Sequence, residues 1–238
     1  MVPSLLIVLS AFATQEPVRG PSTLMAPAAP ARQTEGEPLD DFRRVMVAGA
    51  VDLNVHGDAK VASAEIDCPT RNGPGIQLHV QDDTLMVTPM HEDQRNTGRC
   101  VLTLRTSGLE GVQISGASKV RGGALSQLEA VQVGGAADLD LRGLGADTFE
   151  LNVAGAGKAR LSGKVDQATL VIAGAADIDA TALTAKTAHL TTHGAGNIQA
   201  TVKDTVHATS AGAGVITVLG GPDKVHQTTA GIGQVVVK

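Results

Sequence analysis

The sequence predicts an all-β protein folded as a single-stranded parallel β-helix, a solenoid with about 19 residues per coil. The first observation is a phrase at 112–120 that recurs at 131–139 and then along the rest of the chain. The second is the regular interval, 18 to 20 residues, between the glycines that mark each repeat, namely Gly116, Gly135, Gly155, Gly174, Gly194, Gly212 and Gly231. A fixed period of this size is typical of solenoids, whose coils each contact only their neighbours.

Apolar residues alternate with polar ones around each of these glycines. In the repeat of Gly135 they lie four and two residues before it, at Val131 and Val133, and four and six residues after it, at Leu139 and Leu141. This alternation is the periodicity of a strand, so each repeat is expected to hold two short strands joined by a tight Gly-Ala corner. About 19 residues are too few for a strand and a helical crossover, so each coil must pair with the next.

Composition agrees with a narrow interior and excludes one class of function. The chain has no Trp, no Tyr and three Phe, yet it is 42% hydrophobic and has 28 Gly. Stacked Val, Ile, Leu, Ala and Thr would fill such an interior, where a globular core normally uses aromatic residues. The net charge is -5 and no basic run is present, so the sequence argues against nucleic-acid binding.

The N-terminal part divides into three expected regions. An apolar run that ends in Ala11-Phe12-Ala13 predicts a signal peptide at 1–13, too short to remain as a membrane-spanning helix. Residues 14–39 contain several prolines among Ala, Ser, Thr and Glu, which predicts a flexible linker. The folded domain is then expected at 40–238, with irregular coils and a cap at 40–110.

Within the irregular region, residues 45–55 match the repeat in register through Gly49. The 67 residues from Gly49 to Gly116 would make about three coils, with strands at 76–80, 84–88 and 101–105 and a tight turn at Asp82-Asp83. The two cysteines, Cys68 and Cys100, both lie here. Export favours a disulfide between them, and two free thiols are the alternative.

Three stretches resemble the family called putative auto-transporter adhesin, head GIN domain. They are DFRRVMV at 41–47, DTLMV at 83–87 and, most specifically, LEGVQISGASKV at 109–120. The resemblance covers roughly residues 40–238. It implies an exported bacterial protein with a right-handed parallel β-helix, and it supplies no catalytic residues.

Two sets of outward residues recur at fixed distances from the glycine. Three and five residues after it, charges alternate in sign from coil to coil, as in Lys119, Asp138, Lys158 and Asp177 and in Arg121, Asp140, Arg160 and Asp179. Five residues before it stand His189, His207 and His226. These histidines are interpreted either as a solvated ladder of stacked rings or as a Zn²⁺ or Cu²⁺ site, because neutral imidazole binds both ions.

The predicted function is an exported, non-enzymatic cell-envelope or surface module with a structural or binding role that includes adhesion, located in the periplasm or at the cell surface. The alternative is a polysaccharide-acting β-helix enzyme, which would need clustered carboxylates and usually aromatic platforms. No cofactor is expected. The expected partner is an unknown envelope or surface component. The C-terminal coil, which ends in a strand at 234–238, is expected either to be covered by the irregular N-terminal segment or to self-associate weakly.

Overall fold

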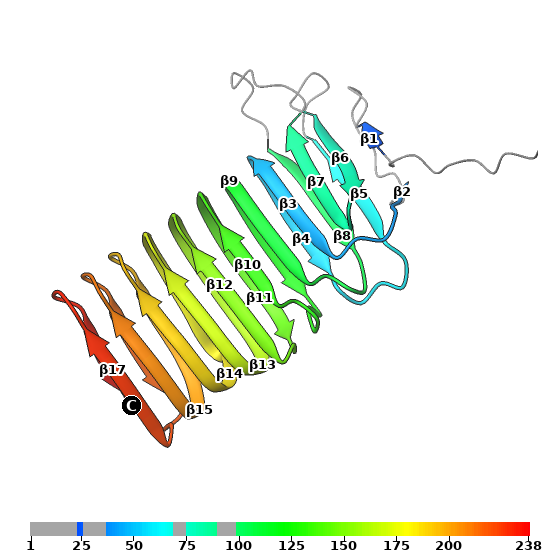
Figure 1. Cartoon of the computed structure of the whole chain (residues 1–238). Helices are drawn as coiled ribbons and strands as arrows, with labels where there is room; N and C mark the ends of the chain where they lie inside the picture. Colours follow the sequence, from blue (N-terminus) through cyan, green and yellow to red (C-terminus); the bar gives the residue numbers. More distant parts are fainter. Residues whose placement is uncertain (1–22, 26–36, 69–74, 90–98) are drawn as a thin grey trace, which may run out of the picture.

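The computed structural model describes residues 23–25, 37–68, 75–89 and 99–238, and these form a parallel β-solenoid (Figure 1). Each coil contributes one segment to each of two sheets, and the chain passes between the sheets at the Gly-Ala corner. The signal peptide predicted at 1–13 and most of the linker predicted at 14–39 lie outside the described residues. The all-β solenoid class is confirmed, whereas its right-handed sense and the domain boundaries stay predictions.

The first sheet holds the segments that precede each corner, all parallel. Along the solenoid axis they are β7 (Thr84–Pro89), β3 (Arg44–Gly49), the first half of β9 (Gly111–Gly123), β10 (Ala130–Val133), β12 (Thr148–Val153), the second halves of β13 (Ala156–Ile172), β14 (Ala175–Thr192) and β15 (Asn197–Ser210), and β17 (Lys224–Thr229).

The second sheet holds the segments that follow each corner, also parallel. Its order is β8 (Cys100–Arg105), β4 (Val51–His56), the second half of β9, β11 (Ala136–Leu144), the first halves of β13, β14 and β15, β16 (Val215–Leu219) and β18 (Gln234–Val237). The inward positions predicted from the repeat are confirmed, because Leu151, Leu170 and Leu190 are fully buried between the sheets.

The order of coils at the N-terminal end differs from the order of the sequence. Gly49 pairs directly with Gly116, so the coil of β3 and β4 stacks on that of β9. The prediction that about three coils separate these glycines is therefore wrong. The intervening chain instead crosses to the far side of β3 and β4, where β7 and β8 form the outer coil. The three strands predicted in this segment are confirmed as β6 (Ile76–Gln81), β7 and β8.

Antiparallel strands extend both sheets beyond that outer coil. On β7 lies β6, joined to it by a turn in which Asp82 and Asp83 both have left-handed backbone angles, and β1 (Thr23–Met25) pairs with β6. On β8 lies β5 (Ser63–Asp67), followed by β2 (Glu37–Pro38). Within the predicted linker the structure thus describes two short strands, β1 and β2.

The C-terminal coil lies at the opposite end of the solenoid from these strands (Figure 1). The described part of the N-terminal region therefore does not cover it, and that half of the sequence expectation is wrong. In this coil every residue of β17 is exposed, and Val225 and Val237 are 39% and 41% exposed. Apolar side chains whose counterparts in earlier coils are buried thus face solvent here.

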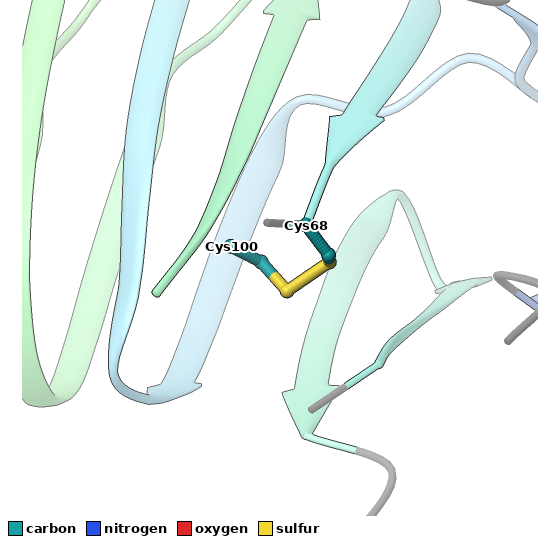
Figure 2. Close-up of a disulfide and its surroundings, with 2 residues drawn as sticks. All are labelled: Cys68 and Cys100. Atoms are coloured by element: carbon teal, nitrogen blue, oxygen red, sulfur yellow. A yellow bond between two sulfur atoms is a disulfide. The ribbon is translucent and has the colours of Figure 1, made fainter. Parts of the chain in front are cut away.

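Cys68 and Cys100 form the predicted disulfide (Figure 2). Cys68 follows β5 and Cys100 begins β8, its antiparallel neighbour. The bridge thus closes the excursion that carries β6 and β7, which is the part of the chain where coil order departs from sequence order.

The corner glycines stack in one column because their backbones approach too closely for a side chain. A Cβ atom at Gly135 would lie 2.1 Å from the carbonyl oxygen of Gly116, and one at Gly155 would lie 1.7 Å from that of Gly135. The same carbonyl of Gly135 accepts a hydrogen bond from the amide of Ala156 at 3.0 Å. Steric exclusion, rather than the freedom of backbone angle inferred from the sequence, therefore requires glycine at these two corners.

We expect Gly135→Ala to lower the free energy of unfolding by at least about 3 kcal/mol, because its Cβ would displace the corner of the previous coil. The adjacent Gly134→Ala is the matched control, since a Cβ there meets nothing nearer than 3.7 Å. Its effect should stay within about 0.5 kcal/mol. Urea denaturation followed by circular dichroism measures both, and equal effects would contradict the steric argument.

Replacing Cys68 and Cys100 together with serine should lower the free energy of unfolding by roughly 3–4 kcal/mol, because a cross-link across 32 positions restricts the unfolded chain. Denaturation of the two proteins without reductant gives the difference. Reduced wild-type protein serves as the control and should match the double variant. Two alkylatable thiols in unreduced exported protein would show that the bridge does not form in the cell.

Candidate binding faces

The outer side of the second sheet carries an ordered pattern of charge, here named the charged face. It consists of four rungs, each formed by the outward residues three and five positions after a corner glycine. The rungs are Lys119 and Arg121 on β9, Asp138 and Asp140 on β11, Lys158 and Arg160 on β13, and Asp177 and Asp179 on β14. Strand pairing places both columns in register, so the predicted alternation of sign from coil to coil is confirmed.

The carboxylates of the charged face lie in a field of nearby cations and donors. Arg142 donates to both oxygens of Asp140, with Nη2–Oδ2 at 2.7 Å and Nε–Oδ1 at 2.9 Å. This bond lowers the pKa of Asp140, and the charges of Arg160 and Arg121 on the neighbouring rungs lower it further. The pKa of Asp179 is also lowered, first by the Thr181 hydroxyl and amide and then by Arg160.

The column of residues three positions after the glycine continues in both directions beyond the four rungs. Before Lys119 stands Asp52, which accepts from the Lys119 amide at 3.2 Å and pairs with Arg99 at 3.2 Å. Sequence reasoning missed Asp52, although its place three residues after Gly49 could have revealed it. After Asp177 stands Asn197, whose amide nitrogen donates to Asp177 Oδ1 at 2.8 Å.

The outer side of the first sheet carries the predicted histidine column on β14, β15 and β17. His189 and His207 stack with ring centroids 4.8 Å apart, and His207 and His226 stack at 4.7 Å. The flanking outward residues are Thr187 and Thr191 in the first of these coils and Thr205 and Thr209 in the second. The middle ring, His207, is half-buried, whereas the outer two are exposed.

A cation and a carboxylate share the outer side of this sheet with the histidines. Lys224 lies two residues before His226 on the same face, while Glu150 lies two strands beyond His189, behind Thr169. The pKa of His207 is lowered, first by partial desolvation between its neighbours and then by repulsion from His189 and His226. A fully protonated column would therefore place three like charges at coil spacing.

The histidine rings do not converge on a common point. Their planes are within 9° and 10° of parallel, so the three rings lie face to face rather than edge-on around a shared centre. Within the described residues, no three His, Cys, Asp or Glu side chains are grouped so as to hold a metal ion. Binding of Zn²⁺ or Cu²⁺ by the column is tested by metal titration.

Two features bear on enzymatic chemistry. Ser210 is fully buried and its hydroxyl donates to the carbonyl of Gly214 at 3.2 Å, so it does not face a substrate. A cavity of about 10 Å³ lies beside Ala159, bordered by Leu139 and Ile178, inside the solenoid.

Among the residues that the structure describes, no helix is long and apolar enough to cross a membrane.

Comparison with known proteins decides the family. The family model described as putative auto-transporter adhesin, head GIN domain, matches residues 41–222. The chain belongs to this family. No curated protein matches the chain.

Solved structures share the fold of this GIN-domain protein. A putative adhesin of Bacteroides fragilis matches with a TM-score of 0.76 and 19% identity, over 93% of this chain and 99% of that one. A putative adhesin of Parabacteroides merdae matches at 0.56 and 20%, covering 93% and 97%. A putative lipid binding protein of Parabacteroides distasonis matches at 0.54 and 16%, covering 93% and 98%. At such identities the likeness shows the fold alone.

Reversing one charge within the charged face should lower the free energy of unfolding more than reversing a charge outside it. Asp138→Lys would place three cations in successive coils, which lie about 4.8 Å apart, so we expect a loss of roughly 1 kcal/mol or more in the free energy of unfolding. Asp223→Lys, in the loop before β17, is the matched control. Urea denaturation at low ionic strength measures both losses. Equal losses would contradict a role of the charged face in fixing the register of the coils.

Stability should fall on acidification because of the histidine column. The folded-state pKa of His207 lies below its unfolded value of about 6.5, so the unfolded chain binds the proton first. The free energy of unfolding should therefore be unaffected by this group above that value and decrease as pH falls below it. His207→Gln should reduce the decrease, while His193→Gln, outside the column, should not. Identical pH profiles for all three proteins would contradict this origin.

Zinc titration distinguishes the two interpretations of the histidines. We expect no micromolar binding, because parallel rings cannot provide a tetrahedral set and no carboxylate completes one in these coils. Isothermal titration of the metal-free protein with Zn²⁺ tests this directly. Micromolar affinity that is abolished by His207→Ala would favour the metal site instead.

Proposed function

We propose that this protein is a non-enzymatic, exported cell-envelope or surface module with a structural or binding role. The observation that carries the proposal is the pair of flat outer faces, on which equivalent side chains repeat over successive coils. Such extended surfaces are what solenoid proteins use for recognition. Membership of the GIN-domain family supports an adhesin-like role within this class.

The arrangement of acidic groups supports a role without catalysis. Asp138 and Asp140, like Asp177 and Asp179, lie on the outer side of the second sheet between cationic rungs, rather than facing each other across a cleft. Glycoside hydrolysis requires two carboxyl groups on either side of a bound sugar. Of the described residues, those around the interior cavity beside Ala159 leave room for no more than a water-sized molecule.

The disulfide and the adhesin family indicate an extracytoplasmic location. The proposed location is the periplasm or the cell surface. Fractionation of tagged full-length protein, combined with protease treatment of intact cells, separates the two. Recovery in the cytoplasm with reduced cysteines would overturn export itself.

The proposed partner is an envelope or surface component, with weak self-association through the C-terminal coil as a second contact. Exposure of Val225 and Val237, together with Ile232 at 89%, supports the latter. Ile232→Lys places a charge on the corner of that coil without touching a buried position. If the coil associates, this substitution should abolish the association.

The test of function presents the folded protein to envelope material. Immobilised full-length protein is exposed to purified envelope polysaccharides, lipids and outer-surface proteins, and retention is compared with that on a variant neutralised at Asp138 and Asp140 and on His207→Gln. Loss of retention in one variant identifies the binding face. The same polysaccharides are assayed for cleavage, and sustained turnover by the purified protein would overturn the non-enzymatic proposal.

A further inference from the structure

The two columns of the charged face alternate in phase, so every rung has a single sign. The β9 rung carries Lys119 and Arg121, and the β13 rung carries Lys158 and Arg160. The β11 and β14 rungs carry two aspartates each. Arg142 pairs with Asp140 at the end of the β11 rung, which leaves that rung acidic overall by one charge. The face is thus striped across the solenoid axis, with a repeat of two coils, roughly 10 Å.

Fixing the coil register does not require the two columns to have the same sign in each coil. Each column needs only to alternate, and the two columns could alternate in opposite phase. Opposite phase would place unlike charges two residues apart on the same side of each strand, where side chains are close enough to attract. The observed phase instead places like charges there, as in Asp177 and Asp179, which is unfavourable within the monomer. The pattern therefore carries a feature that the monomer does not use.

We propose that the charged face is a docking surface for a second copy of this chain, packed face to face with its solenoid axis antiparallel. Each rung of one copy then lies opposite a rung of the other sign. Uniform rungs favour this arrangement, because a rung of a single sign still faces opposite charge when the two copies are displaced slightly along the strands.

The order of signs selects this arrangement over the others. From β9 to β14 the rungs are positive, negative, positive and negative. In the reverse direction they are negative, positive, negative and positive, so a reversed copy presents the opposite sign to every rung. A two-fold axis parallel to the strands, passing between the β11 and β13 rungs, places the β9 rung opposite the β14 rung of the second copy and the β11 rung opposite its β13 rung. Parallel, in-register packing would oppose like charges throughout.

The same symmetry limits assembly through the charged face to two copies. Both copies use the same surface, so the contact is isologous and closes. Seven of the eight charged side chains are exposed and Asp140 is half-buried, so all are accessible for such a contact. Exposed ion pairs are weak and are screened by salt, so the dimer should form at low ionic strength and at high protein concentration.

Sedimentation equilibrium of the full-length protein at about 20 mM and about 500 mM salt tests the dimer. We expect a monomer–dimer equilibrium whose association constant falls at least about 10-fold between these conditions. A strict monomer at low salt up to about 1 mM protein would overturn the proposal. An association that is unchanged by salt would overturn it as well.

Complementary charge reversals test the pairing of rungs. The first variant carries Asp138→Lys and Asp140→Lys, and the second carries Lys158→Asp and Arg160→Asp. Each should be monomeric alone, since its β11 and β13 rungs now have one sign. An equimolar mixture should restore the dimer, because each variant supplies the charge that the other lacks. A purely intramolecular role for the ladder cannot produce rescue between separate chains, so absence of rescue from two folded variants would reject the proposal.

Two further variants keep the test decisive. If reversal prevents folding, as judged by circular dichroism, the neutral variant Asp138→Asn with Asp140→Asn replaces it and should weaken association at least about 10-fold, in line with lost charge pairs. Ile232→Lys, on the C-terminal corner far along the solenoid, should leave this dimer intact. Loss of association in Ile232→Lys, without loss in the neutral variant, would assign self-association to the C-terminal coil and overturn the docking face.

Discussion

The close contact between successive corner glycines is the constraint on which the structure depends. The corner glycine carbonyls from Gly135 to Gly212 each accept a hydrogen bond from the next coil, as in Gly155 with the amide of Ala175 at 3.0 Å. A Cβ atom at Gly174 would lie 2.0 Å from that same oxygen of Gly155. This contact holds the coils at strand spacing at one edge of the solenoid and leaves no room for a shift along the axis. Because side chains repeat with the coil, fixing the corner fixes every column on both sheets.

The two outer faces follow from that fixed register but differ in the physics they display. On the charged face, neighbouring coils attract each other, and the lowered pKa of Asp140 reports Arg142 together with the rungs on either side. On the histidine column, neighbouring coils carry identical groups, and the lowered pKa of His207 reflects partial desolvation together with repulsion by identical neighbours. One repeat thus produces a face that is strengthened by its charges and another that is weakened when it gains them.

Much of the fold could be predicted because the repeat places each side chain by counting from a glycine. The buried columns, the stacked histidines and the alternating charges all follow from position within the coil, whereas the disulfide between Cys68 and Cys100 followed from the expectation of export and the count of two cysteines. The order of the first coils could not be predicted, because the excursion between β4 and β9 pairs its strands with β3 and β4 from the far side. The sequence marks that segment as irregular, but it does not show on which side of β3 and β4 its strands pair. Asp52 could have been found by counting three residues from Gly49, but the coil order was needed to place it beside Lys119.

The buried side chains become more polar along the solenoid axis, and this change falls between the coils of the charged face and those of the histidine column. Two residues before the corner, the buried side chain is Val153 and then Ile172, but it becomes Thr192 and Ser210 in the next two coils. The Thr192 hydroxyl is buried without a hydrogen-bond partner, which costs free energy that a methyl group would not. In a solenoid, stability is a sum of local terms between adjacent coils. The charged face therefore lies on the coils with the more apolar interior, whereas the histidine column lies on coils held by less apolar burial, where a small electrostatic change has the larger effect.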